Sequence, residues 1–154
     1  MATIEKSIDV NAPVRQVYNQ WTQFEDFPRF MDGVERVAQL EDDRLHWKAN
    51  VYGQDEEWFA VITEQIPDKR IAWRSTSGAS NAGVVTFHYI DDETTRIMLQ
   101  LEYEPEGLVE NIGDWLGLQA QRIEGDLHRF KKFIEYRDSA TDAWRGEIEQ
   151  ASTE

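Results

Sequence analysis

The beginning of the chain alternates between two hydrophobic repeats. Over residues 3–10 apolar and polar side chains alternate, apart from Lys6, and this pattern predicts a half-buried strand. Over residues 14–21 apolar side chains recur at the spacing of one helical face. We therefore predict a strand followed by a short helix, with Asn11 as the N-cap of that helix.

The next segment, TQFEDFPRFMDGVERV at residues 22–37, places four large apolar side chains around Pro28. They are Phe24, Phe27, Phe30 and Met31. Thr22 and Glu25 have the spacing of a capping box, which predicts the start of a second helix. Pro28 cannot donate a backbone hydrogen bond, so this helix must be short or kinked. We interpret the segment as a lid at the mouth of an apolar cavity.

A period of two then dominates residues 34–103, interrupted by turn signals at EDD, GQD, PDK, SGAS and DDE. This pattern predicts six strands joined by five short turns in an antiparallel meander. After Pro105 the helical period returns, and its apolar residues form one stripe. They are Leu116, Ala120, Ile123, Leu127, Phe130 and Ile134. A long amphipathic helix is predicted here.

The order of these elements predicts an α+β fold. A seven-stranded antiparallel sheet would curl around the long C-terminal helix, and the two short helices between the first two strands would close its open end. Residues 1–138 would form a single domain. Residues 139–154 have little apolar content and predict an acidic tail that is flexible or loosely docked.

Four segments resemble the helix-grip fold of START domains and of the birch-pollen-allergen type. They are VNAPVRQVYNQWTQFEDFPRFMDGVERV, ITEQIPDKRIAWRST, NAGVVTFHYIDDETTRIMLQLEYEP and DLHRFKKFIE. Within this SRPBCC superfamily the chain is similar to the bacterial polyketide cyclase/dehydrase and lipid-transport family, which includes coenzyme Q-binding START-like proteins. The resemblance implies a cavity for a hydrophobic ligand. It does not separate binding, transport and catalysis, because the family includes all three.

Composition narrows the classes of partner. The net charge of −14 disfavours nucleic acid and anionic membrane surfaces, and no apolar stretch is long enough to cross a bilayer. Without cysteine, neither disulfides nor Cys-bound zinc can form, and the N-terminus has no signal-peptide pattern. We expect a soluble, cytoplasmic protein without a cofactor, whose partner is a small hydrophobic molecule.

Strand alternation and the helical stripe assign a set of side chains to the cavity. The candidate ligand-binding residues are Phe30, Trp47, Trp73, Arg74, Ser75, Phe87, Tyr89, Leu99, Leu101, Tyr103, Trp115, Leu116, Ile123 and Leu127. Arg74 is out of phase with Trp73 and enters the cavity only if a bulge shifts its strand. The segment GDWLG, residues 113–117, is either a loose helix start or a hinge that moves Trp115 and Leu116.

No catalytic or metal-binding set emerges from the pattern. His46 and His88 are out of phase with their apolar neighbours, and His128 lies just off the helical stripe, so all three are predicted at the surface. We therefore favour binding or transport of a lipid, quinone or polyketide-like molecule over a cyclase or dehydratase. A further alternative is an interaction protein with a self-filled cavity. Such a protein would form a homodimer through Phe59 and Val61, which make their strand apolar on both faces.

Overall fold

A computed structural model describes residues 2–51, 53–78, 81–103, 112–136 and 146–148, with side chains except those of residues 2, 51, 54 and 112–116. Its elements are β1 (Ala2–Val10), α1 (Val14–Trp21), the 3-10 helix η1 (Phe24–Arg29), β2 (Val34–Glu41), β3 (Arg44–Val51), β4 (Gln54–Ile66), β5 (Arg70–Gly78), β6 (Asn81–Asp91), β7 (Thr94–Tyr103) and α2 (Ile112–Glu135).

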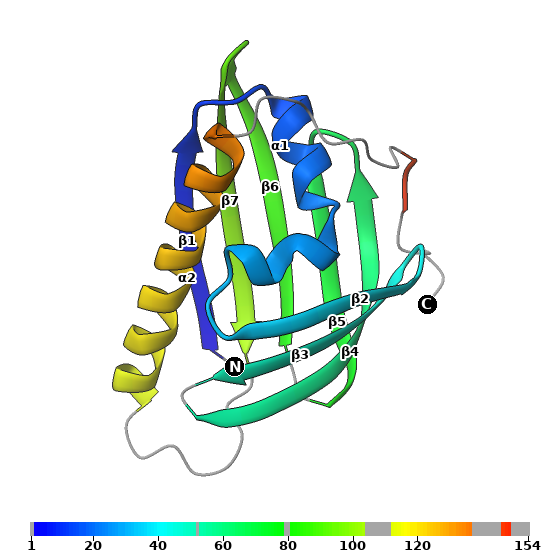
Figure 1. Ribbon diagram of the computed structural model, residues 1–154, viewed down its shortest axis with the longest axis vertical. Coiled ribbons are helices and arrows are strands. Elements are labelled where there is room, and N and C mark those ends of the chain that lie inside the picture. The colour runs from blue at the N-terminus through cyan, green and yellow to red at the C-terminus, as the bar shows by residue number, and fades with distance from the viewer. Residues whose placement is uncertain (1, 52, 79–80, 104–111, 137–145, 149–154) are drawn as a thin grey trace.

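The sheet has seven antiparallel strands in the order β1-β7-β6-β5-β4-β3-β2, which confirms the predicted meander and fold class. Figure 1 shows β1, β7, β6 and β5 standing roughly upright while β2 and β3 cross below them. The pairing of β4 with β5 has two register shifts, at Thr63 and Thr76. Such bulges increase local twist and bend a strand. The resulting concave face receives α2, α1 and η1.

The short helices are present, but their predicted caps are wrong. Pro13 occupies the N-cap position of α1 with no side-chain capping bond, since its fixed backbone angle already suits the helix start. Thr22 Oγ1 donates to the carbonyl of Asn19 instead of capping the next helix. That helix is a single 3-10 segment containing Pro28, so the proline limits it as predicted.

Hydrogen bonds fasten the second half of α2 to the segment after η1 and to β1. Asp126 accepts from the backbone N–H of Asp32 at 2.8 Å and pairs with Arg129, whose Nε donates to the carbonyl of Phe30 at 2.9 Å. Burial raises the pKa of Asp126, although these donors oppose the shift. Lys131 Nζ also donates to the carbonyl of Asp9 at 3.0 Å. These bonds hold α2 against the segment after η1 and against the end of β1.

Part of the predicted C-terminal tail pairs with the sheet. Gln65 and Ile148 exchange backbone hydrogen bonds of 2.7 and 2.8 Å, forming an antiparallel bridge. This edge of β4 is open because β3 pairs with β4 only as far as Val61. Ile148 packs against the core, so the described part of the tail covers an exposed strand edge.

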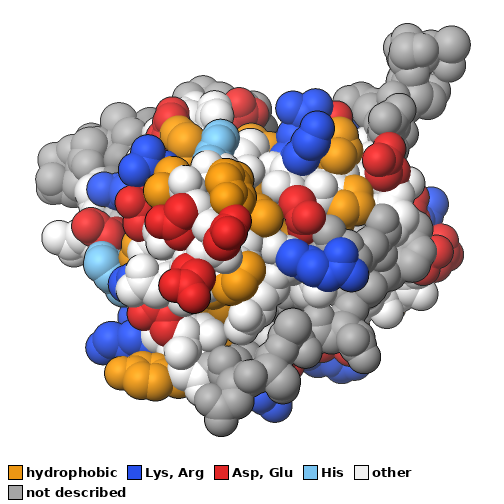
Figure 2. Space-filling model, turned by 90° about the horizontal axis from the view of Figure 1, so that it is seen from above, with side chains coloured by type: hydrophobic (Ala, Val, Ile, Leu, Met, Phe, Trp, Pro, Cys, Tyr) orange, Lys and Arg blue, Asp and Glu red, His pale blue; other side chains and the backbone are white. Residues whose placement is uncertain are grey.

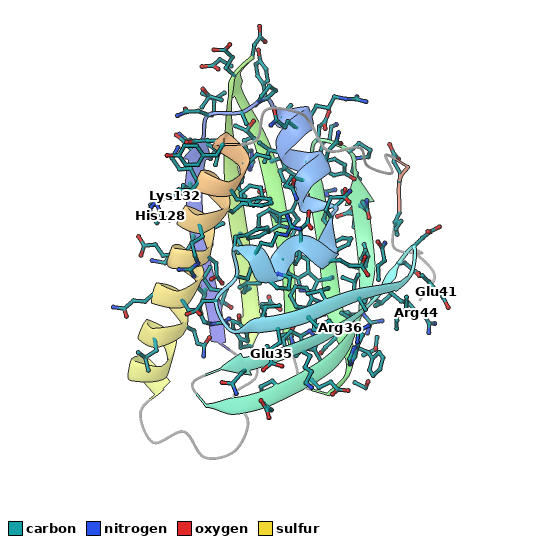
Figure 3. All side chains as sticks on the ribbon, viewed as in Figure 1. Glu35, Arg36, Glu41, Arg44, His128 and Lys132 are labelled. Atoms are coloured by element: carbon teal, nitrogen blue, oxygen red, sulfur yellow. The ribbon has the colours of Figure 1, made fainter. Side chains whose placement is uncertain are left out.

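The outer surface carries mixed charge. Seen from the end that bears the β6–β7 turn, acidic and basic side chains lie next to one another with hydrophobic side chains between them (Figure 2). At the β2–β3 turn, Glu41 and Arg44 lie 3.9 Å apart and both project outward (Figure 3). No helix in the described part of the chain is both long and apolar enough to span a bilayer.

Candidate functional site

One end of the interior is filled by aromatic rings. We call it the packed end and define it by Trp21, Phe27, Phe30 and Phe130. The ring of Phe130 lies 4.9 Å from that of Trp21 and 5.1 Å from that of Phe30, and Phe130 has no exposed surface. These edge-to-face contacts leave the rings well packed. Phe30, predicted to bind ligand, is therefore a core residue that attaches η1 to α2.

The concave face of the sheet carries a second aromatic group, which we call the tryptophan wall: Trp47, Trp58 and Trp73. Trp47 on β3 pairs directly with Trp58 on β4, and their rings are stacked at 5.5 Å with planes 10° apart. Trp47 is 7% exposed, whereas Trp58 and Trp73 are only partly buried although they pack against the core. Because Trp58 lies on a strand that is apolar on both faces, the sequence pattern did not place it in the site.

A glycine lets Trp73 lie close to the sheet. Gly83 on β6 is the cross-strand partner of both Trp73 and Leu101. A Cβ atom at Gly83 would lie 2.5 Å from Cζ2 of Trp73 and 2.7 Å from Cδ2 of Leu101. Any larger residue would therefore push the indole ring away from the sheet and toward the interior.

Polar groups lie where α2 meets the end of β7. Arg122 donates to Oε1 of Gln119 through Nε at 3.2 Å and through Nη2 at 2.9 Å. Nη2 also donates to the hydroxyl of Tyr103 at 3.4 Å. Gln119 is only 3% exposed, and no described carboxylate lies within ion-pair distance of Arg122. The partly buried guanidinium is thus held by neutral groups. The sequence pattern did not indicate Arg122 or Gln119, because neither belongs to the apolar stripe of the helix.

Each stacked indole of the tryptophan wall has a buried nitrogen. Nε1 of Trp47 and Nε1 of Trp58 are shielded from solvent, and neither donates to any described atom. A buried donor without an acceptor costs about 1–3 kcal/mol. Among the other predicted polar groups, Ser75 Oγ accepts from the N–H of Asn81 at 3.1 Å.

One predicted placement is wrong, and the conditional placement of Arg74 in the cavity is not adopted. Tyr89 is 62% exposed, and its hydroxyl donates to Asp92, a hydrogen bond that raises the pKa of the phenol. Its alternation was right, since it pairs with buried Thr95, but the β6–β7 hairpin extends beyond the helices there (Figure 1). Arg74 is exposed, because the bulge of its strand falls at Thr76, after the arginine.

The remaining predicted residues either belong to the core or have side chains that the structure does not describe. Phe87 contacts Tyr18 and Trp21 beside the packed end. Four more of the predicted residues belong to the core cluster: Leu99, Leu101, Ile123 and Leu127. The side chains of Trp115 and Leu116 lie outside the described residues, so the proposed hinge stays a prediction.

Histidines lie away from the interior, as predicted. His46 is on the outer face of the sheet beside Glu57 and Phe59, and His88 is exposed. His128 projects from the outer side of α2 together with Lys132 (Figure 3). Among the described residues, no group of three or more acidic or histidine side chains could hold a metal ion.

The family model for polyketide cyclase / dehydrase and lipid transport matches residues 10–132, and the chain belongs to this family. It is 52% identical over 149 residues to a Streptomyces lincolnensis protein described as an uncharacterized 17.2 kDa protein in the melC2-rnhH intergenic region, covering 96% of this chain and 99% of that one.

Two solved structures share the fold. A START superfamily protein from Mycobacterium smegmatis matches with a TM-score of 0.76 at 14% identity, covering 86% of this chain and 97% of its own. The Zhui aromatase/cyclase from Streptomyces sp. R1128 matches with a TM-score of 0.70 at 16% identity, covering 93% of this chain and 99% of its own. This chain therefore shares the overall fold of these two proteins.

Proposed function

We propose that this protein binds a small hydrophobic molecule between the tryptophan wall and α2. One observation carries the proposal: Trp58, Trp73 and Tyr103 pack against the core yet remain partly exposed, whereas the rings of the packed end are buried. Large apolar side chains on a concave face with a few polar groups at its margin are typical of small-molecule sites.

The energetics favour such a ligand. Burial of apolar surface contributes about 25 cal/mol per Å², so covering roughly 200 Å² of the wall would contribute about 5 kcal/mol before the entropic cost of binding. Arg122, Gln119 and Tyr103 could orient one polar end of the molecule, since they already form one hydrogen-bonded group.

Binding, rather than cyclisation or dehydration, agrees better with the acidic and basic groups. The three histidines lie outside the interior. Asp126, the buried carboxylate among the described residues, already accepts from the N–H of Asp32 and from Arg129. A group fastened in this way holds α2 and is poorly placed to exchange protons with a substrate.

Native mass spectrometry of freshly purified protein tests the proposal. We expect an adduct of a few hundred daltons that is lost on denaturation and reduced in Trp73→Ala. Tyr136→Ala is the matched control, because Tyr136 is 83% exposed. A clean apo mass, together with no saturable binding of a naphthalene probe by calorimetry, would contradict the proposal.

The outer face of β4 supports a second candidate function, association of two copies. Phe59 is 41% exposed and contacts the ring of His46 on β3, so the short helices do not cover this face. If this face forms a dimer, the native mass will be twice that of the chain and Phe59→Asp will halve it. A monomer at all concentrations would remove this candidate.

A further inference from the structure

A pocket with a polar lining lies between η1, β2 and the end of β4. We call it the polar pocket and define it by Thr22, Glu25, Asp26, Gln39 and Gln65, which line a cavity of about 210 Å³. None of its lining residues belongs to the tryptophan wall or to the packed end. This volume is far above what one water molecule needs, so the pocket can hold a small organic molecule.

Gln65 on β4 is the most buried residue of the polar pocket, with 2% of its surface exposed. Its cross-strand partner Ile71 is fully buried, so both side chains point to the interior face of the sheet. The backbone of Gln65 bonds to Ile148, but its side-chain amide forms no hydrogen bond with a described atom. Because a buried amide without partners is costly, a polar group that enters the pocket is stabilised by bonding to it.

Two carboxylates of η1 lie beside this amide, and the cations around them are few. Exposed Glu25 accepts the backbone N–H of Gln39 at 3.4 Å, and no described cation lies within ion-pair distance of its carboxylate. Asp26 accepts from Nε2 of Gln20 at 3.0 Å, and Nε of Arg29 lies 3.8 Å from it. The pocket therefore carries negative charge that a cationic ligand would neutralise.

The other polar side chains of the pocket also offer oxygen atoms. Thr22 donates its hydroxyl hydrogen to the carbonyl of Asn19 at 2.6 Å, and Nε2 of Gln39 donates to the carbonyl of Asp42 at 3.3 Å. These bonds use donors and leave the hydroxyl and amide oxygens as acceptors. The lining thus favours a ligand that donates hydrogen bonds.

We infer that the polar pocket binds a small organic amine as its ammonium ion, with the charge beside Glu25 and Asp26 and with Gln65 as a further hydrogen-bond partner. A metal ion suits the pocket less well, since among the described residues no group of three acidic or histidine side chains comes together. The net charge of −14 raises the local concentration of cations. The inference does not depend on the proposed function, because the two sites share no residue.

Matched probes test whether the charge is recognised. 4-Amino-1-butanol and 1,4-butanediol are nearly equal in size, but only the first is a cation at pH 7. In ¹H–¹⁵N spectra, we expect the amine to shift the side-chain amide signals of Gln65 with a dissociation constant in the millimolar range, and the diol to bind at least about tenfold more weakly. Gln65→Met assigns these signals, because it removes the amide and keeps a side chain of similar length.

Two acidic variants test where the charge acts. Glu25→Gln removes one carboxylate of the pocket, and we expect the amine to bind about threefold to tenfold more weakly. Glu41→Gln is the matched control, since Glu41 projects outward at the β2–β3 turn and does not line the pocket (Figure 3). Both variants change the net charge equally, so a general attraction of cations to an acidic surface would affect them alike.

The other outcomes overturn the inference. Equal binding of the amine and the diol would show that the pocket does not recognise charge. Equal weakening in Glu25→Gln and Glu41→Gln, or Gln65 signals that do not saturate at tens of millimolar amine, would show that the pocket is not the binding site. Tighter binding of Nα-acetyl-lysine amide than of 4-amino-1-butanol would assign the pocket to a lysine side chain of a partner and overturn its assignment to a free amine.

Discussion

The packed end and the tryptophan wall use the same kind of side chain for different purposes. At the packed end, Trp21 and Phe130 make an edge-to-face contact, and both side chains are buried. At the wall, Trp58 and Trp73 face the same interior but stay partly exposed, and two indole nitrogens lack acceptors. Aromatic residues that are fully surrounded stabilise the fold, whereas partly exposed ones keep ring surface that another group can still cover.

The two regions also differ in the hydrogen bonds that α2 makes near them. The second half of α2 is fastened by Asp126 and Arg129 to the segment after η1. Nearer its start, Arg122 contacts Gln119 of its own helix and the Tyr103 hydroxyl at 3.4 Å. We therefore expect substitutions at the packed end to affect mainly stability, and substitutions at the wall to affect mainly ligand affinity.

The largest expected effect is that of Phe130→Ala. Removing this fully buried ring leaves a cavity beside Trp21 and Phe30, and we expect a loss of about 3–5 kcal/mol in the free energy of unfolding. Urea denaturation measures it. Trp73→Phe at the wall is the comparison, and its loss should be clearly smaller. Equal losses would mean that the two regions are packed alike.

Gly83→Ala should disturb the wall without touching the packed end. The added methyl would collide with Trp73 and Leu101, and overpacking of this kind typically costs about 1–3 kcal/mol. We also expect weaker binding of 2-acetylnaphthalene, because the added methyl displaces the indole of Trp73 from its position on the wall. Gly53→Ala is a control for general loss of glycine, although its positive φ adds some strain there. Unchanged affinity in Gly83→Ala would contradict the assigned position of Trp73.

We expect Asp126 to make the stability of the fold depend on pH. Because burial raises its pKa, the fold favours the protonated form, and this stabilising contribution is lost as pH rises through the raised pKa. Asp126→Asn keeps an oxygen acceptor for Asp32 and Arg129 but does not titrate. We expect its stability relative to the parent protein to improve as the pH rises above about 4, the range in which an unperturbed aspartate ionises.

Asp126→Ala is the companion variant. It leaves the N–H of Asp32 and the guanidinium of Arg129 without this acceptor, so it should be destabilised by about 1–3 kcal/mol across the whole range. Chemical denaturation at several pH values measures all three proteins. If the difference in unfolding free energy between Asp126→Asn and the parent protein does not change with pH, the pKa of Asp126 is the same in the folded and unfolded states.

The smallest expected effect is that of Tyr89→Phe. Its hydroxyl bonds to Asp92 at the exposed end of the β6–β7 hairpin, outside both interior regions. We expect no change in probe affinity and a change in stability within about 0.5 kcal/mol. A clear loss of affinity measured by calorimetry would restore Tyr89 to the site.

Periodicity predicted the elements because it depends on which faces are buried. The seven strands, the short helix limited by Pro28 and the stripe of Ile123, Leu127, Phe130 and Ile134 all follow from spacing alone. Tyr89 shows where this reasoning stops. Alternation gives the face of a strand, but it does not say how far the strand extends beyond the helices that cover it.

The site needed information that spacing does not contain. The stacking of Trp47 on Trp58 depends on the register between two strands, and the role of Arg122 depends on its distance from Tyr103 on β7. Likewise, the caps predicted for the short helices failed because Thr22 found a nearer acceptor in Asn19. Each of these contacts depends on which side chains the folded chain brings together, and spacing along the sequence does not give that information.

We propose that the interior binds ligand at the tryptophan wall and not at the packed end. Intermolecular nuclear Overhauser effects between bound 2-acetylnaphthalene and assigned side chains test it most directly. We expect contacts from the probe to the indoles of Trp47, Trp58 and Trp73, and none to Phe130. Contacts confined to Trp21 and Phe130, or to side chains on the outer face such as Phe59, would contradict it.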